Sequence, residues 1–145
     1  METIIREADL NDCPELSRLS TQLGYPCSSS VIHSNLTAWG DDPDQVVFVS
    51  TVGEGYLLGF CHAFISKRLF LAPFAELGGL VVDERFRGEG TGRKLVDEFE
   101  RWAAEKGIKE IRVRSNIIRA GAWEFYTGLG YQDSKKQTVF LKDLD

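Results

Sequence analysis

The sequence has 145 residues, of which 43% are hydrophobic, and its formal net charge at pH 7 is −5. This size and composition are ordinary for one globular domain with its own core, so we expect a single domain over residues 1–145. The acidic balance disfavours nucleic acid as a partner, and the absence of a long apolar run disfavours a membrane-spanning helix.

The cysteines and histidines are few and widely spaced: Cys13, Cys27, Cys61, His33 and His62. None of these spacings is typical of a metal site, so we expect no metal. The first residues lack the apolar core of a signal peptide, and unpaired thiols are usual in reducing compartments. The sequence therefore predicts a cytoplasmic protein with reduced cysteines.

The N-terminal part predicts a strand followed by two helices. Thr3–Arg6 has strand character, and Asp12 with Glu15 has the form of a capping box at the start of a helix that Gly24 ends. A serine in Ser28–Ser30 is expected to cap the second helix, which runs to Trp39.

Three strands are predicted next. Gln45–Val52 and Tyr56–Ser66 are separated by Gly53–Gly55, which is typical of a hairpin turn. Arg68–Ala75 is interpreted as a loop whose apolar residues either line a substrate mouth or pack against a helix. Glu76–Val82 is then a strand.

The remaining chain alternates helices and strands. Thr91–Lys106 has helical spacing and Lys109–Ser115 is a strand, so Glu76–Val82 and these two segments form a parallel βαβ unit. Ala120–Leu129 predicts a short helix and Gln137–Lys142 a last strand. The fold class is therefore α/β, with a mixed sheet and helices on both of its faces.

A basic, glycine-rich turn joins the Glu76–Val82 strand to the long helix. It reads Arg87-Gly88-Glu89-Gly90-Thr91-Gly92, with Arg93 and Lys94 directly after it. The first amides of a helix lack hydrogen-bond partners within the helix and lie at the positive end of the helix dipole. Phosphate is the expected ligand. The turn is not a Walker loop, because no Gly-Lys-Ser/Thr follows the glycines, and it is not a dinucleotide fingerprint, because Arg93 occupies the third glycine position.

The pattern Arg-x-x-Gly-x-Gly resembles the acetyl-CoA pyrophosphate loop of the GNAT family of N-acetyltransferases. The segment Ala122–Tyr131, with Phe125-Tyr126 inside it, resembles a second element of that family, and Asn116 resembles its pantetheine-binding asparagine. The resemblance covers nearly the whole chain. It implies a mostly antiparallel sheet in which one parallel pair of strands splays apart to admit the pantetheine arm of acetyl-CoA.

The resemblance also implies which residues bind acetyl-CoA. They are Leu80, Val81, Val82, Arg87, Gly88, Glu89, Gly90, Thr91, Gly92, Arg93, Asn116 and Tyr126. Two departures from the family pattern stand out. Glu89 is acidic within a loop that binds an anion, and Asp83-Glu84 lacks the proline that is common before the loop.

Two side chains are candidates for proton transfer. An alkylamine has a pKa of about 10.4 and attacks a thioester only when neutral, so a base is required. Glu76 is either that base or a solvated carboxylate at a strand start; Glu124, His62 and His33 are weaker candidates. Tyr126 is either the acid that protonates the leaving thiolate, as the resemblance implies, or a buried aromatic.

We therefore expect an acetyl-CoA-dependent N-acetyltransferase of the small-molecule amine type. The amine, a small cationic metabolite, attacks the thioester directly in a ternary complex. The alternatives are a non-catalytic acyl-CoA-binding regulatory module, a protein or peptide N-acetyltransferase, and a nucleotide-binding α/β domain. Members of the GNAT family often form dimers, so a homodimer is an assembly that the resemblance implies, and neither nucleic acid nor membrane is expected as a partner.

Overall fold

The structure is a computed structural model that describes residues 2–114 and 121–145. The chain divides into two compact units, Met1–Arg114 and the much smaller Ser115–Asp145. The glycine-rich turn and Glu76 belong to the first unit, and Tyr126 belongs to the second.

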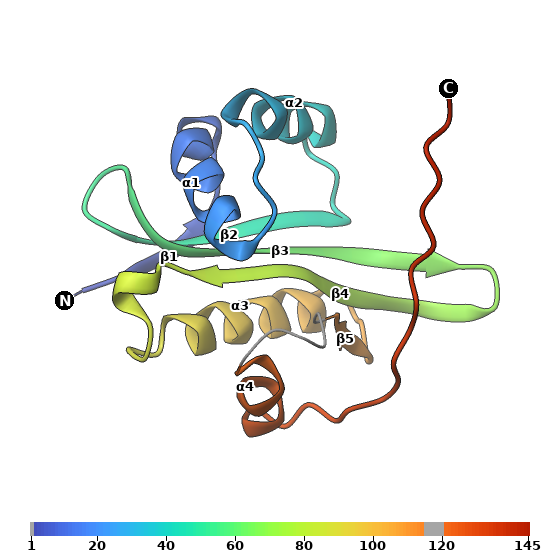
Figure 1. The fold of residues 1–145 in the computed structure, drawn as a ribbon. Coiled ribbons are helices and arrows are strands. Elements are labelled where there is room, and N and C mark those ends of the chain that lie inside the picture. The colour runs from blue at the N-terminus through green and yellow to red at the C-terminus, as the bar shows by residue number, and fades with distance from the viewer. Residues whose placement is uncertain (1, 115–120) are drawn as a thin grey trace. The chain divides into compact units, whose positions relative to one another are not determined.

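A five-stranded sheet in the order β1-β2-β3-β4-β5 forms the centre of the first unit (Figure 1). The strands are β1 (Ile4–Glu7), β2 (Gln45–Val52), β3 (Tyr56–Arg68), β4 (Leu71–Val82) and β5 (Ile111–Val113). The first three pairings are antiparallel and the β4–β5 pairing is parallel. The predicted mixed, mostly antiparallel sheet is confirmed.

Helices cover both faces of this sheet, as predicted (Figure 1). Helices α1 (Cys13–Leu23) and α2 (Ser29–Trp39) lie on one face, and α3 (Thr91–Glu105) lies on the other. Four apolar residues of α3 recur at helical spacing and are buried, Leu95, Val96, Phe99 and Ala103, and Trp102 beside them is half-buried. On the α1 face the core consists of Leu16, Leu19, Val49, Leu57, Phe60 and Val81.

The start of α1 differs from the predicted capping box. Asp12 precedes the helix but its side chain does not cap it; instead, the carboxylate accepts hydrogen bonds from the Arg6 guanidinium and the Asp9 amide. The capping box belongs to Asp9 and Asp12 around the short 3-10 helix η1 (Leu10–Asp12). The prediction was wrong because Arg6 in the neighbouring strand competes for the Asp12 carboxylate. Gly24, with φ of 100°, ends α1 as predicted, and the side chain of Ser28, one of the three predicted serines, caps the start of α2.

The predicted Arg68–Ala75 loop was wrong over most of its length. Strand β3 continues to Arg68, Leu69 and Phe70 form an exposed turn, and β4 begins at Leu71. Pro73 obscures the strand pattern, but it lies before Ala75, where pairing with β5 begins. A proline is tolerated on such an unpaired edge because no neighbouring strand there requires its missing N–H.

The second unit contains helix α4 (Ala122–Gly128), and Gly130 adopts φ of 94° beyond its end. The strand predicted at Gln137–Lys142 is wrong, because residues 131–145 contain neither helix nor strand. Val139, Phe140 and Leu141 have strand propensity but are more than four-fifths exposed. Propensity alone does not make a strand, because a strand is stabilised by packing and pairing within a sheet.

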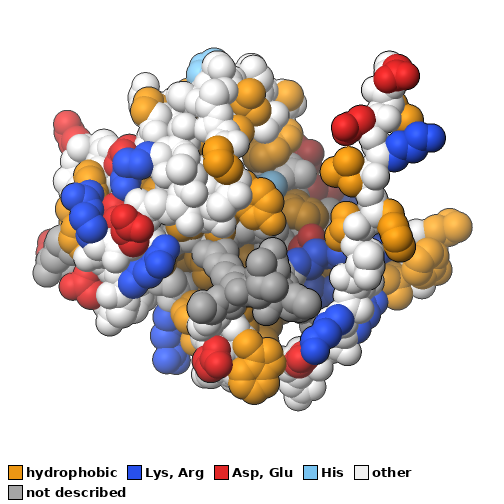
Figure 2. Space-filling model, in the orientation of Figure 1, with side chains coloured by type: hydrophobic (Ala, Val, Ile, Leu, Met, Phe, Trp, Pro, Cys, Tyr) orange, Lys and Arg blue, Asp and Glu red, His pale blue; other side chains and the backbone are white. Residues whose placement is uncertain are grey.

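Acidic and basic side chains are interspersed on the face of the molecule in Figure 2. No helix within the described ranges has both the length and the apolar character needed to cross a membrane.

Candidate active site

The turn between β4 and α3 places two glycines in conformations that other residues rarely adopt. After β4 the chain forms the 3-10 helix η2 (Glu84–Phe86), and then Gly88 and Gly90 take φ of 84° and 86°. A Cβ atom built at either position would meet no described atom within 4 Å. Glycine is needed here for the backbone conformation, and it leaves the surface of the turn clear for a ligand.

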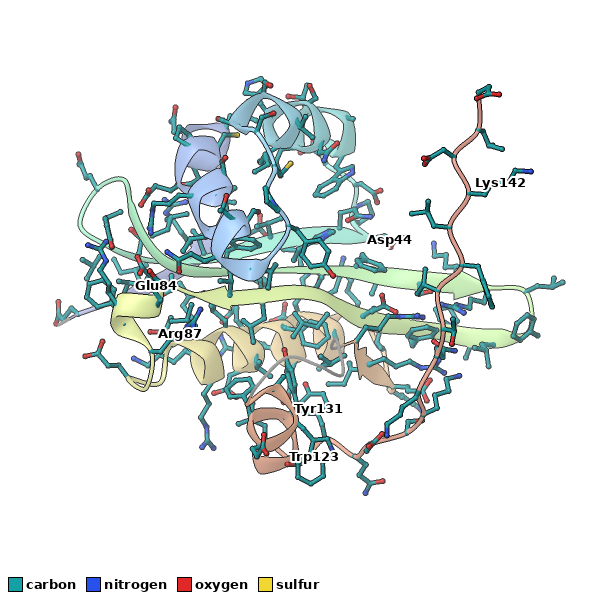
Figure 3. The ribbon with its side chains drawn as sticks, viewed as in Figure 1. Asp44, Glu84, Arg87, Trp123, Tyr131 and Lys142 are labelled. Atoms are coloured by element: carbon teal, nitrogen blue, oxygen red, sulfur yellow. The ribbon has the colours of Figure 1, made fainter. Side chains whose placement is uncertain are left out.

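Positive charge surrounds this turn. Arg87, Arg93 and Lys94 are exposed, and no described side chain caps the N-terminus of α3. The first hydrogen bond of the helix joins the Lys94 amide to the Gly90 carbonyl at 3.1 Å, so the amides before Lys94 point outward without an intrahelical acceptor. Arg87, labelled in Figure 3, donates from Nε to the Val82 carbonyl at 3.2 Å. The arrangement is suited to an anion such as pyrophosphate.

The pairing of β4 with β5 ends at Leu77, five residues before β4 itself ends at Val82. The two strands pair only over Ala75–Leu77 and Ile111–Val113. Beyond Leu77, β4 has no β5 partner among the described residues, although it stays paired with β3 to Val82. In an antiparallel pair every other residue directs its N–H and C=O away from the partner. The predicted splayed pair is therefore present, and the outward main-chain groups of Leu80–Val82 have no β5 partner among the described residues.

Glu76 lies in the middle of β4 rather than at a strand start. It is 7% exposed, and its carboxylate accepts a hydrogen bond from Nε of Arg114 at 2.8 Å. The alternative of a solvated carboxylate is therefore wrong, since β4 extends five residues before it. Whether Glu76 is the base stays a prediction.

Two glycines, Gly78 and Gly79, follow Leu77 in β4. The β3–β4 register shifts between His62 and Ala63, which leaves Gly78 as an extra residue in β4. A Cβ at Gly78 would lie 2.7 Å from Cε1 of Phe64, so a larger residue would displace the ring opposite Glu76. Gly78 is nevertheless exposed to solvent. A ligand can thus approach the backbone of β4 directly beside the buried carboxylate.

Tyr126 lies on α4 and is half-buried. Its ring makes edge contacts with Phe125 and Tyr131, at centroid distances of 5.0 and 5.8 Å. Phe125 is also half-buried, and Glu124, the weaker candidate for the base, is exposed. Asn116 lies outside the described residues. The roles of Tyr126 and Asn116 stay predictions.

The two histidines have different surroundings. His62 stacks on Trp39 at 4.8 Å, and its Nε2 lies 2.8 Å from the Gln45 amide oxygen. Burial lowers the pKa of His62, because a charged imidazole is poorly solvated there. It is a packed, hydrogen-bonded histidine on a central strand, and it is half-buried. His33 is exposed on α2.

The sequence analysis missed Asp83, which follows β4 directly and is fully buried. Its carboxylate accepts hydrogen bonds from Arg18, Tyr56 and the Arg85 amide. An aspartate between a strand and a short helix is a common cap, and this signal could have identified it. Within the described ranges no group of histidine, cysteine and acidic side chains could hold a metal ion.

Comparisons with known proteins agree with this geometry. A model of the acetyltransferase (GNAT) family matches residues 10–131. An uncharacterized N-acetyltransferase of Chlorobaculum tepidum is 27% identical over 142 residues, which cover 94% of this chain and 79% of the relative.

Two solved structures share the fold. A transcriptional regulator from Bacillus halodurans has a TM-score of 0.85 at 22% identity, over 97% of this chain and all of that one. An aminoglycoside N-acetyltransferase in complex with CoA has a TM-score of 0.84 at 18% identity, over 99% of this chain and 96% of that one. Because the family model matches most of the chain, and the fold and the splayed β4–β5 pair agree with it, this protein belongs to the GNAT family of acetyltransferases.

Proposed function

We propose that this protein is an acetyl-CoA-dependent N-acetyltransferase acting on the primary amine of a small cationic metabolite. The observation that carries the proposal is the open glycine turn at the N-terminus of α3. Arg87 and Arg93 flank it, and it follows the part of β4 that has no β5 partner among the described residues. Family membership supports the reaction class.

In this proposal the pyrophosphate of acetyl-CoA is held by the turn and its flanking cations. The residues concerned are Arg87, Gly88, Glu89, Gly90, Thr91, Gly92 and Arg93. Main-chain groups of Leu80–Val82 hydrogen-bond the pantetheine arm where β4 parts from β5. Asn116 is proposed to bind the same arm. Acetyl-CoA supplies an activated thioester carbonyl, and the protein supplies orientation and proton transfer.

Glu76 is proposed as the base that takes the proton from the amine, directly or through a water molecule. At pH 7 a free alkylamine pays a penalty of about 4–5 kcal/mol to become neutral, which makes such an acceptor valuable. One carboxylate oxygen is fixed by Arg114, and the backbone beside it at Gly78 is exposed. This support orients the carboxylate while leaving an approach for the acceptor.

Tyr126 is proposed as the proton donor to the departing thiolate. Its contacts with Phe125 and Tyr131 limit the orientations of the ring. A thiol has a pKa of about 8.5, so the thiolate leaves with only modest assistance from an acid.

Two observations support a small cationic amine. The chain is acidic, and an aminoglycoside N-acetyltransferase shares its fold. We propose a cytoplasmic location, which the three free cysteines support, because disulfides are rare in reducing compartments.

The proposal is tested by binding and turnover. Acetyl-CoA at one hundred times its Kd should stabilise the folded state by about 2.7 kcal/mol and raise the Tm. A panel of small amines is then assayed by release of free thiol. No thermal shift at millimolar acetyl-CoA would overturn the proposal. Binding without turnover would favour the acyl-CoA-binding module, and faster turnover of peptides than of any small amine would favour a protein acetyltransferase.

A further inference from the structure

Asp83 sits where β4 ends and the turn begins, and its carboxylate accepts hydrogen bonds from three residues. Its Oδ2 accepts hydrogen bonds from Nη1 of Arg18 and the hydroxyl of Tyr56, both at 2.8 Å. Its Oδ1 accepts from the Arg85 amide at 3.0 Å and so caps η2. Burial opposes the charge, but these hydrogen bonds outweigh it and hold the pKa of Asp83 well below its usual range.

The partners of Asp83 come from three separate elements. Arg18 on α1 also binds the Glu15 carboxylate through Nε at 2.7 Å and the Leu57 carbonyl through Nη2 at 3.0 Å. The guanidinium groups of Arg18 and Arg85 both lie over the Tyr56 ring, at 5.1 and 5.7 Å from its centroid. Arg85 also donates to the Tyr56 hydroxyl. The cluster therefore ties α1 and the start of β3 to the end of β4.

Helix α1 holds η2 at a second point. The Glu84 amide donates to the side-chain oxygen of Gln22 at 2.9 Å, and Glu84 is labelled beside the turn in Figure 3. The Phe86 amide donates to the Asp83 carbonyl at 2.8 Å, and the Phe86 ring makes an edge contact with Tyr56. The chain is thus fixed on α1 and β3 up to the residue before Arg87.

The turn itself offers little to fix its own position. Gly88 and Gly90 have no side chains, and the space beside them is open. Glycine also has the largest backbone freedom of any residue. Helix α3 is held by its own buried residues, so the segment that enters the turn sets the position of Arg87 and of the two glycines relative to the α3 amides.

We propose that Asp83 is a positioning residue for cofactor binding: the buried carboxylate fixes the turn in the orientation that receives the pyrophosphate of acetyl-CoA. This inference rests on the proposed function. Asp83 does not touch the ligand; it acts through η2 and Arg87. Its loss therefore weakens acetyl-CoA binding more than it lowers kcat.

Asp12 provides a matched control. It is also buried, at 4% exposure. It accepts hydrogen bonds from the Arg6 guanidinium and from the backbone amide of Asp9, the N-cap residue of η1. Within the described residues its carboxylate bonds only Arg6 and Asp9, which lie outside the turn. Asp12→Asn thus removes a similar buried charge without touching the entry to the turn.

The test compares acetyl-CoA Kd by calorimetry, KM and kcat, and Tm in the wild type, Asp83→Asn and Asp12→Asn. Both variants should lower the Tm. Asp83→Asn should raise Kd and KM by about tenfold, the equivalent of one charge-assisted hydrogen bond, with kcat changed much less. Asp12→Asn should leave Kd and KM unchanged.

Tyr56→Phe keeps the ring and removes one donor to Asp83, so it tests the inference even where Asp83→Asn does not fold. We expect a KM increase of a few-fold and an unchanged kcat. A wild-type Kd in Tyr56→Phe and in any folded Asp83→Asn would overturn the inference, as would an equal KM increase in Asp12→Asn. A wild type that binds no acetyl-CoA would overturn the proposed function instead, and this inference with it.

Discussion

The two ends of the β4 site region are built in opposite ways. The turn after Val82 is exposed. Two of its residues, Gly88 and Gly90, have no side chain and have open space around them. Glu76 is a buried side chain that Arg114 holds within the sheet. Groups that contact a ligand equally in the ground and transition states improve binding, whereas a group that moves a proton lowers the barrier. The comparison teaches that changes at the two ends should affect different kinetic constants.

Glu76→Gln should give the largest effect. The amide keeps the shape of the side chain but cannot accept the proton, so kcat should fall by about 10²- to 10⁴-fold with acetyl-CoA Kd nearly unchanged. Steady-state kinetics and calorimetry measure the two quantities. Glu110→Gln is the control, because Glu110 also pairs with an arginine, Arg112, but is exposed. A wild-type kcat in Glu76→Gln would assign the carboxylate a structural role.

Tyr126→Phe should lower kcat by about 10²-fold, within the range of a positioned acid, and leave acetyl-CoA Kd unchanged. The substitution keeps the ring contacts with Phe125 and Tyr131 and removes only the hydroxyl. The exposed Tyr25 supplies the control Tyr25→Phe. The effect is expected only where thioester cleavage limits the rate. Normal turnover under that condition would mean that Tyr126 serves packing alone.

Arg87→Ala should raise the acetyl-CoA KM by about one to two orders of magnitude, since a charge-assisted hydrogen bond contributes about 1.5–3 kcal/mol. The kcat should change less, because the pyrophosphate charge is the same before and during the reaction. Arg101→Ala is the control, as Arg101 is exposed near the other end of α3 and pairs with Glu98. A collapse of kcat with unchanged KM would contradict the role of Arg87 in cofactor binding, and with it the contrast between the turn and Glu76.

Glu89→Gln should have the smallest effect and the opposite sign. Glu89 is exposed within a turn proposed to bind an anion, so its charge opposes the ligand. An exposed charge contributes roughly 0.2–1 kcal/mol, which corresponds to a KM decrease of at most about fivefold. The difference should shrink as salt is raised from low to high ionic strength. An increase in KM would show that Glu89 supports the turn instead.

The sequence by itself determined most of the elements around the site. The helical spacing of Leu95, Val96 and Phe99, the left-handed stop at Gly24 and the conformations of Gly88 and Gly90 are local properties. Each depends on the residue itself or on neighbours within one helical turn, so a pattern in the sequence is sufficient to identify it. The Arg-x-x-Gly-x-Gly turn was found in this way.

Only the tertiary structure decided where charges and strand edges find their partners. Asp12 turns from α1 to Arg6, Asp83 gathers Arg18 and Tyr56 from distant segments, and β4 extends back to Leu71. Gln137–Lys142 has the composition of a strand and forms none. A carboxylate or an extended segment takes the partner that folding brings nearest, and such pairings join residues that are far apart in the chain. The hydrogen-bonded cluster of Asp83, Arg18 and Tyr56 could therefore be identified only in the folded protein.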